Sequence, residues 1–244
     1  MPDPSQITSK GTVSACPECG KPSEALVLGG KAYPQHCDKC IAGFEADARR
    51  DRKVKLTESE AMVEHERAER WREICPPLYQ KNDVALFPAA AWRKVSQWAV
   101  NPRGLLLAGP TGMCKTRMIW ARLRVAVMRG VGVAAFDSIQ FGHDCIDAFT
   151  SSRGTEWFDA LWKVPILFID DLGKTPATER VESELFGLIE FRIAHQRPIL
   201  ATTNATGAEL TDKLSADRGA PMIRRLREFC DLVVCDDKPK ERAE

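Results

Sequence analysis

The middle of the chain holds a short stretch in which glycines, a lysine and a threonine have the spacing needed to bind phosphate. It follows the apolar run 105–108 and precedes residues 115–128, whose apolar spacing predicts a helix. Strand, glycine-bearing loop and helix form a P-loop, whose backbone N–H groups face the phosphates. The residues expected to bind ATP are Gly109, Pro110, Thr111, Gly112, Met113, Cys114, Lys115, Thr116 and Arg117. Among them, Lys115 would contact the β- and γ-phosphates and Thr116 would ligate Mg²⁺.

One position departs from the P-loop pattern. The residue before the lysine is normally glycine, and here it is Cys114. Glycine lets the backbone approach a phosphate with no Cβ in the way, whereas cysteine keeps the N–H donor but adds a side chain. The other fixed positions are present, so we interpret Cys114 as a tolerated departure. The alternative is a loop that no longer binds nucleotide.

Carboxylates follow a second apolar run. Residues 165–169 lead into Asp170 and Asp171, and such a continuous run is typical of a parallel strand covered on both faces. Beside a P-loop, Asp170 would hold Mg²⁺ and Asp171 would orient or deprotonate the attacking water. Asn204 ends the run 198–204 and would reach the γ-phosphate or the water, because active groups of open parallel sheets gather at that edge. The alternative is an ordinary strand followed by an Asp-Asp turn.

Two C-x2-C pairs, separated by seventeen residues, lie near the start of the chain and suit a structural Zn²⁺ site with four thiolates. The ligands are Cys16, Cys19, Cys37 and Cys40. The segment between the pairs has Gly29-Gly30 near its middle and predicts a hairpin, so residues 14–44 are expected to form a zinc ribbon. His36 is a rival ligand to Cys37, and four unrelated thiols are the other alternative.

Length and composition limit the class of protein. The 244 residues suit one ATPase domain with a small appendage, and 28% charged with 44% apolar residues is a globular composition. A net charge of +1 gives no general attraction to nucleic acid, so any DNA contact needs a local patch. Residues 1–12 lack the apolar core of a signal peptide, and no run is long enough for a membrane helix. We therefore expect a cytoplasmic protein with no membrane contact.

The order of segments predicts the domain organisation. Residues 1–44 would form a zinc-ribbon module that docks a partner, and the highly charged residues 45–75 a helical linker. Residues 76–236 alternate strand-like with helical segments and would form the ATPase domain, followed by a charged tail, 237–244. The fold class is therefore α/β, a three-layer sandwich with a five-stranded parallel sheet.

Together these motifs resemble those of AAA+ ATPases of the DnaC/IstB type, which include bacterial and phage helicase loaders. The matching pieces, within residues 76–236, are Gly109-x4-Cys-Lys-Thr116, Ile-Asp170-Asp171-Leu-Gly, Thr202-Thr-Asn204 and Arg-Arg225-Leu-Arg. The resemblance implies Walker A, Walker B and sensor-1 roles for Lys115, for the two aspartates and for Asn204. It also implies an arginine finger at Arg225. A zinc-bearing N-terminal module is similar to that of DnaI-type loaders, where it implies docking on the replicative helicase.

The function implied by this resemblance is the ATP-dependent loading of a replicative helicase onto single-stranded DNA during replication. Such a protein would form a homo-oligomer on ATP, and its hydrolysis would be slow if Cys114 disturbs the loop. One alternative is a transposition helper ATPase of the IstB type, which would coat duplex DNA and recruit a transposase. Another is an adaptor that holds ATP without hydrolysing it. A small-molecule phosphotransferase is disfavoured because no acceptor-site constellation is recognisable.

Three sets of side chains have more than one possible role. Around Arg225, apolar residues at helical spacing would turn it away from the sheet, toward a neighbour's ATP site, with Arg218, Arg224 and Arg227 as fallback candidates. DNA contacts are expected from Lys174 and Arg180, and from Phe141 and Arg153, with ordinary surface charge as the alternative. The tryptophans Trp92 and Trp98 would pack on the ATPase core or, alternatively, contact adenine.

Overall fold

The computed structural model describes residues 7–8, 13–28, 31–150, 154–174, 178–205, 207–213 and 218–236. The chain divides into two compact units, Met1–Val63 and Glu64–Glu244, and the boundary falls within helix α1, Asp38–Ile74. Each unit is described by itself. No helix among the described residues combines the length and the apolar character that crossing a membrane demands.

The N-terminal unit contains a small antiparallel sheet. Its strands are β1 (Ile7–Thr8), β2 (Val13–Ala15), β3 (Pro22–Leu28) and β4 (Lys31–Pro34). Strand β3 pairs with each of the other three, and Leu28 lies opposite Lys31 across a hairpin, as the glycine pair predicts. Helix α1 begins at Asp38 and therefore includes Cys40 in its first turn. The predicted ribbon is thus a hairpin followed directly by a helix.

The C-terminal unit is built on a five-stranded parallel sheet, as predicted. The strands are β5 (Gly104–Ala108), β6 (Val133–Asp137), β7 (Ile166–Asp170), β8 (Ile199–Thr203) and β9 (Cys230–Val234). Their order across the sheet is β6-β7-β8-β5-β9, and all pairs are parallel. Strands β5, β7 and β8 therefore lie side by side, so the P-loop, the two aspartates and Asn204 all follow neighbouring strand ends.

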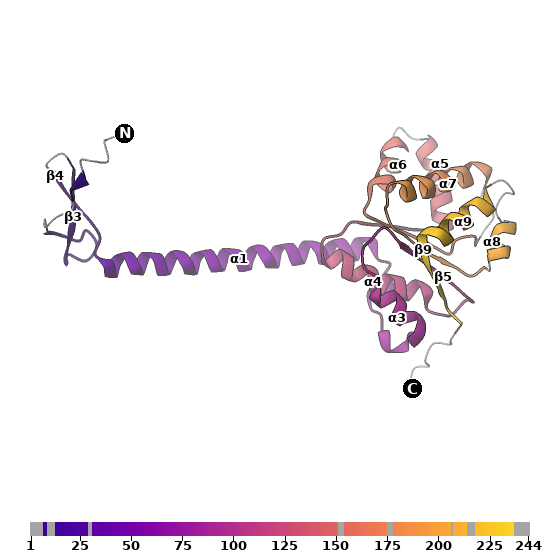
Figure 1. Cartoon of the computed structure of the whole chain (residues 1–244), viewed down its shortest axis with the longest axis horizontal. Coiled ribbons are helices and arrows are strands. Elements are labelled where there is room, and N and C mark those ends of the chain that lie inside the picture. Colours follow the sequence, from indigo (N-terminus) through magenta and orange to yellow (C-terminus); the bar gives the residue numbers. More distant parts are fainter. Residues whose placement is uncertain are drawn as a thin grey trace. The chain divides into compact units, whose positions relative to one another are not determined.

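Helices cover both faces of this sheet and make it the middle of three layers (Figure 1). The helical segments are α2 (Pro77–Gln80), the 3-10 helix η2 (Val84–Leu86), α3 (Ala89–Gln97), α4 (Lys115–Met128), α5 (Ser138–Thr150), α6 (Gly154–Lys163), α7 (Glu179–Ala194), α8 (Gly207–Lys213) and α9 (Gly219–Phe229). Helix α1 ends before a proline pair, and Pro77 opens α2, where a missing N–H costs nothing.

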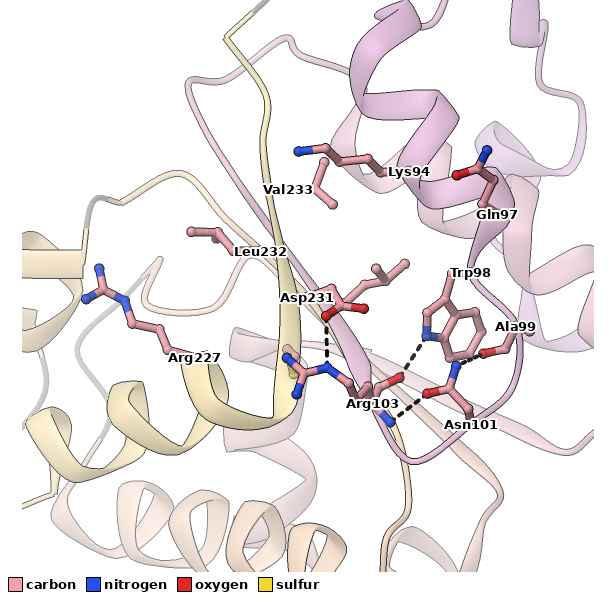
Figure 2. Close-up of a pocket in the computed structure, with 12 residues that line it drawn as sticks. Lys94, Gln97, Trp98, Ala99, Asn101, Arg103, Arg227, Asp231, Leu232 and Val233 are labelled. Atoms are coloured by element: carbon pink, nitrogen blue, oxygen red, sulfur yellow. Dashed lines mark hydrogen bonds and ion pairs between the residues drawn. The ribbon is translucent and has the colours of Figure 1, made fainter.

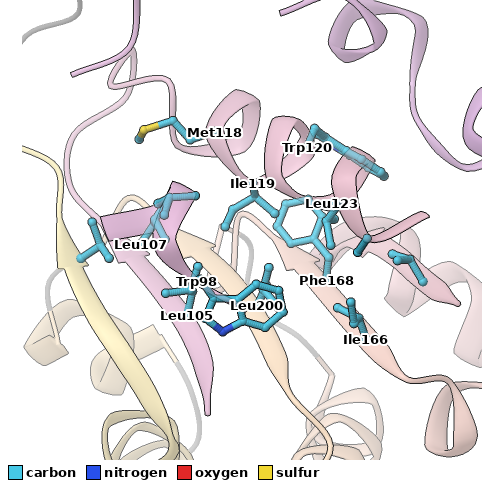
Figure 3. Close-up of a cluster of buried hydrophobic side chains, with 14 of the residues drawn as sticks. Trp98, Leu105, Leu107, Met118, Ile119, Trp120, Leu123, Ile166, Phe168 and Leu200 are labelled. Carbon is cyan, nitrogen blue, oxygen red and sulfur yellow. The ribbon is translucent and has the colours of Figure 1, made fainter. Parts of the chain in front are cut away.

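One core lies between the sheet and α4 (Figure 3). Leu105 and Leu107 of β5 face this core, while Leu106 belongs to the opposite one, because successive strand residues point to opposite faces. Ile119 and Leu123 pack from α4. The two tryptophans before the P-loop pack on the core of the ATPase unit, which is the first of their two interpretations. Trp98 is buried in this core and Trp92 packs against its edge.

The second core lies under α5, α7 and α9 and contains Phe141, which corrects one expectation. Phe141 is only 1% exposed and stacks on Phe136 with ring centroids 4.6 Å apart. The expectation that Phe141 contacts DNA is therefore wrong. The sequence indicates helical segments over 138–163 but does not reveal which of their faces packs against the sheet.

A buried arginine ties α7 to the strands. Arg192 is 0% exposed and donates to the carbonyls of Leu161, Val164, Pro165 and Pro198, at 2.8, 2.9, 3.2 and 3.0 Å. These carbonyls precede β7 and β8, at the edge opposite the P-loop. Burial lowers the pKa of Arg192 to about 10. The four carbonyls replace the water lost by the two terminal nitrogens, while the buried Nε has no hydrogen-bond partner among the described residues.

Candidate functional site

The P-loop connects β5 to α4 and lines a cavity of about 350 Å³. The predicted loop residues Thr111 to Arg117 contribute to its wall, together with Asp171 and Asn204 from the ends of β7 and β8. Lys174, Leu78 and Tyr79 complete it. The walls thus combine backbone N–H groups at a helix N-terminus with a lysine and a threonine, a set of donors suited to phosphate. The sequence-predicted loop and Asp171 therefore meet at one cavity, and Asp170 lies in the wall of an adjoining one.

Cys114 adopts the conformation that explains why glycine is normal at its position. Its φ is 57°, in the left-handed region, directly before the first residue of α4. A side chain at this φ costs about 1–2 kcal/mol, a cost that glycine does not have. Burial raises the pKa of the Cys114 thiol, so the group stays protonated and uncharged near the phosphate cavity.

Replacing Cys114 with glycine should therefore raise the free energy of unfolding. We expect a gain of about 0.5–1 kcal/mol, since relief of the left-handed strain exceeds the extra chain entropy of glycine. Urea unfolding measures the gain, and ATP turnover should hold or rise. Cys114→Ala is the matched control, because alanine removes the thiol but keeps the strained Cβ. An equal gain in the alanine variant would attribute the effect to the thiol instead.

Lys115 is held by three oxygen acceptors. Its Nζ donates to the carbonyls of Gly109 and Pro110, at 2.8 and 2.7 Å, and to Asn204 Oδ1 at 2.7 Å. Burial lowers the pKa of Lys115, and the nearby Cys235, Asp171 and Asp170 counteract part of this effect. The ammonium is therefore fixed at the mouth of the loop, where it would meet the phosphates.

Asp170 and Thr116 form the candidate Mg²⁺ site. Thr116 Oγ1 donates to Asp170 Oδ1 at 2.8 Å, and Thr202 Oγ1 donates to the same oxygen at 2.5 Å. Burial raises the pKa of Asp170, while the two hydroxyl donors oppose that rise. Hydroxyl and carboxylate oxygens are the ligands that Mg²⁺ prefers, so this pair fits the ion. The sequence did not assign Thr202 a role, although it belongs to the Thr-Thr-Asn segment.

Asp171 takes a strained backbone conformation that turns its carboxylate toward the cavity. Its φ is 52°, a region that aspartate tolerates better than most residues. The backbone N–H of Asp171 donates to Thr202 Oγ1 at 2.9 Å. Its carboxylate accepts from Asn204 Nδ2 at 3.1 Å and from Lys174 Nζ at 2.9 Å. Asn204 thus links Asp171 to Lys115, and the predicted catalytic residues other than Arg225 form one connected group.

A second cavity of about 360 Å³ adjoins the first and shares Tyr79, Asp171 and Lys174 with it. Trp120 contributes to its wall and stacks with Tyr79, with ring planes 13° apart. Tyr79 also lies under the Arg117 guanidinium. No sequence pattern points to Tyr79, because α2 is too short for a periodic one.

Arg225 and Arg180 lie away from this group, whereas Lys174 joins it through Asp171. Arg225 is on α9, where its Nε donates to Glu190 Oε1 of α7 at 2.9 Å. Lys174 pairs with Asp171, and the Arg180 guanidinium lies 3.6 Å from the ring centroid of Phe149. Arg153 lies outside the described residues. The finger and DNA roles of these side chains therefore stay predictions.

The four predicted zinc ligands form a cluster in the N-terminal unit. The Sγ atoms of Cys16, Cys19, Cys37 and Cys40 all lie within 4.8 Å of one another. Those of Cys19 and Cys37 are 3.6 Å apart, close to the roughly 3.8 Å that four sulfurs at 2.3 Å from a tetrahedral Zn²⁺ require. His36 is not part of the cluster and instead packs edge-on against Phe44. The donor set thus fits Zn²⁺ without the histidine.

Backbone N–H groups favour thiolates in this cluster. A hydrogen bond from the Cys19 backbone lowers the pKa of Cys16 to about 6, and one from the Cys40 backbone lowers the pKa of Cys37. The side chain of Cys19 and the other nearby thiols raise the pKa of Cys40 to about 12. Four thiols this close cannot all ionise without a cation, which is the condition that Zn²⁺ satisfies.

Comparison with known proteins places the fold. No family model matches the chain, and no curated protein matches its sequence. The DnaC helicase loader superposes with a TM-score of 0.53 at 20% identity, over 68% of this chain and 99% of that structure. DnaI gives 0.51 at 21%, over 59% and 80%. AMPPCP-bound DnaA from Aquifex aeolicus gives 0.52 at 18%, over 59% and 44%.

These similarities concern the fold. The chain spans less than half of the DnaA structure and nearly all of the DnaC structure. Identities near 20% establish shared architecture, and the architecture is the AAA+ three-layer sandwich that the motifs predict. The predicted resemblance to DnaC- and DnaI-type loaders is confirmed at this level, together with a four-cysteine cluster near the N-terminus.

Proposed function

We propose that this chain is an ATP-hydrolysing AAA+ protein that loads a replicative helicase onto single-stranded DNA. The observation that carries the ATPase part is the connected group at the cavity, Lys115–Asn204–Asp171 beside Thr116–Asp170. The loader part is supported by the fold shared with the DnaC helicase loader, combined with a cysteine cluster suited to a docking module. We infer a cytoplasmic protein that forms homo-oligomers when ATP is bound.

Each cavity residue has a distinct part in the proposed reaction. The P-loop N–H groups and Lys115 would bind the β- and γ-phosphates, and Thr116 with Asp170 would hold Mg²⁺, which supplies charge neutralisation. Asp171 would orient the attacking water and accept its proton, with Asn204 fixing the carboxylate. The raised pKa of the buried Asp170 is consistent with a carboxylate that gains from a nearby cation.

The docking part of the proposal is tested with the zinc module. Purified protein should contain about one Zn²⁺ per chain, and Cys37→Ser should lose the metal, because three thiolates leave the tetrahedral site incomplete. The same variant should no longer retain a bacterial replicative helicase in a pull-down, while the ATPase unit stays folded. Elemental analysis, helicase retention and ATP binding are measured together. Cys145→Ala is the control, because Cys145 belongs neither to the cysteine cluster nor to the nucleotide cavity.

Three results would redirect the proposal. Full zinc content in Cys37→Ser would remove the assigned ligand set. Retention of a transposase in place of the helicase by the wild-type chain would favour the transposition helper. Phosphate release below one turnover in the presence of both partners would favour the non-hydrolysing adaptor.

The finger role of Arg225 predicts complementation between variants. Arg225→Ala should bind ATP but lose hydrolysis by roughly 10³-fold, because the guanidinium would stabilise γ-phosphate charge in a neighbouring copy. Asp171→Asn should also bind ATP and hydrolyse it far more slowly. Mixing the two should restore part of the activity, since one copy supplies the arginine and another the carboxylates. Phosphate release from the mixture is the measurement.

Arg93→Ala is the control, because Arg93 is an exposed arginine of α3 and is not a candidate for the finger. The pair of Arg225 with Glu190 must open for the finger to act, so Glu190→Gln should not reduce turnover. A mixture that assembles yet stays inactive would contradict the finger role.

A further inference from the structure

Strand β9 forms one edge of the sheet and leaves half of its backbone groups without a strand partner. Among the described strands, β9 pairs with β5 alone. The N–H of Cys235 donates to the carbonyl of Ala108 on the β5 side. Backbone groups of alternate residues in a strand point to the same side. Those of Leu232 and Val234 therefore point away from β5, toward the open edge.

The side chains at this edge are apolar and accessible. Leu232 is 45% exposed and Val234 is 54% exposed, on a strand whose neighbour Val233 is 1% exposed. An exposed strand edge with aliphatic side chains is a template for another strand. Natural proteins usually protect such an edge with charge, and cations are present here.

A groove of about 900 Å³ runs beside β9, with three cationic side chains and one carboxylate in its wall (Figure 2). Figure 2 shows Lys94 extending from α3 on one side of β9 and Arg227 from α9 on the other. Arg103 pairs at 2.9 Å with Asp231, the one carboxylate among the described residues of the wall, and also donates to the carbonyl of Glu228. The groove wall is therefore cationic overall.

Hydrogen bonds hold the loop that forms one wall of the groove. The indole N–H of Trp98 donates to the carbonyl of Arg103 at 2.8 Å, and Asn101 Oδ1 accepts from the Arg103 N–H at 2.8 Å. These bonds fix the loop between α3 and β5, so the groove keeps its shape beside the strand. Its position next to β9 is at the sheet edge, away from the P-loop residues.

We propose that this groove binds an extended, acidic and apolar segment of a partner protein, which pairs with β9 as a sixth strand. The outward N–H and C=O groups of Leu232 and Val234 would supply main-chain hydrogen bonds. Alternate aliphatic side chains of the segment would cover those of β9, and its carboxylates would meet Lys94 and Arg227. Strand addition to a free edge combines these three sources of affinity. The inference does not depend on nucleotide chemistry.

The test uses a fluorescein-labelled synthetic peptide, Val-Asp-Val-Glu-Val-Asp-Val-Glu, with an Asn/Gln version as the neutral control. Anisotropy should detect the acidic peptide and find the neutral one bound at least fivefold more weakly. Amide hydrogen exchange provides the specific signature. Leu232 and Val234 should exchange at least tenfold more slowly with the peptide, whereas Val233, already bonded to β5, should not change.

Lys94→Glu should weaken the acidic peptide about fivefold, and Lys163→Glu, an exposed lysine elsewhere, should not. Unchanged exchange at Val233 confirms that the variants keep the sheet. The proposal is overturned if the peptide binds without slowing Leu232 and Val234, or if the neutral peptide binds equally. Slowing of these amides by a (dT)12 oligonucleotide would assign the groove to nucleic acid and also overturn it.

Discussion

Lys115→Ala should weaken ATP binding at least a hundredfold. The substitution removes the ammonium that lies at the mouth of the loop and would contact the β- and γ-phosphates. Charge-assisted hydrogen bonds to ligand oxygens are worth about 1.5–3 kcal/mol each, and one ammonium would make more than one of them. Titration with a fluorescent ATP analogue or calorimetry measures the loss.

Lys174→Ala is the control for this prediction, because Lys174 lines the same cavity but pairs with Asp171 instead of lying within the loop. It should retain most of the affinity. Both variants should keep the wild-type circular dichroism spectrum, since each removes a side chain from a cavity wall. Unchanged ATP affinity in Lys115→Ala would contradict the prediction, because it would mean that ATP does not bind at this loop.

Arg192→Leu should lower the free energy of unfolding by roughly 3–5 kcal/mol. The guanidinium is 0% exposed, and its loss leaves the carbonyls before β7 and β8 without their donors. Each buried acceptor without a partner costs about 1–3 kcal/mol, which outweighs the relief of removing a buried charge. Urea unfolding monitored by tryptophan fluorescence is the measurement.

Arg192→Lys tests whether the charge or the planar shape of the guanidinium stabilises the fold. A lysine keeps the charge but lacks the planar fork that reaches four carbonyls at once, so it should also be destabilising. Arg224→Leu, on the exposed face of α9, should change stability by less than about 0.5 kcal/mol. Equal stability of Arg192→Leu and wild type would show that water replaces the guanidinium at these carbonyls.

The parts of this structure that follow from local sequence were predictable. Apolar runs of strand length gave all five strands of the large sheet, because strands covered on both faces leave little room for polar residues. The P-loop, Asp170, Asp171 and Asn204 lie together because polar residues ending parallel strands share one sheet edge. The cysteine spacing predicted the cluster for a similar reason, since metal ligation fixes the separation of its ligands.

The parts of the structure that depend on contacts between distant segments were not predictable from the sequence. Tyr79 reaches the cavity from a four-residue helix, and Thr202 bonds to Asp170 across the sheet, contacts that no periodic pattern encodes. Phe141 was expected to contact DNA, because the sequence does not state which neighbour covers the apolar face of its helix. Helix α8 was missed because its short segment has no long apolar stripe.

Asn204 couples the two side chains to which it is hydrogen-bonded, those of Lys115 and Asp171. One end of its amide accepts from Lys115 and the other donates to Asp171. Any ligand that draws the ammonium away alters the energy of the bond to the carboxylate, because both bonds share one rigid planar group. By thermodynamic reciprocity, binding of another group at the Asp171 carboxylate must alter the affinity of that ligand by the same factor. Ligand binding at the P-loop and hydrogen bonding at the Asp171 carboxylate are thus linked equilibria, coupled through the side chain of Asn204.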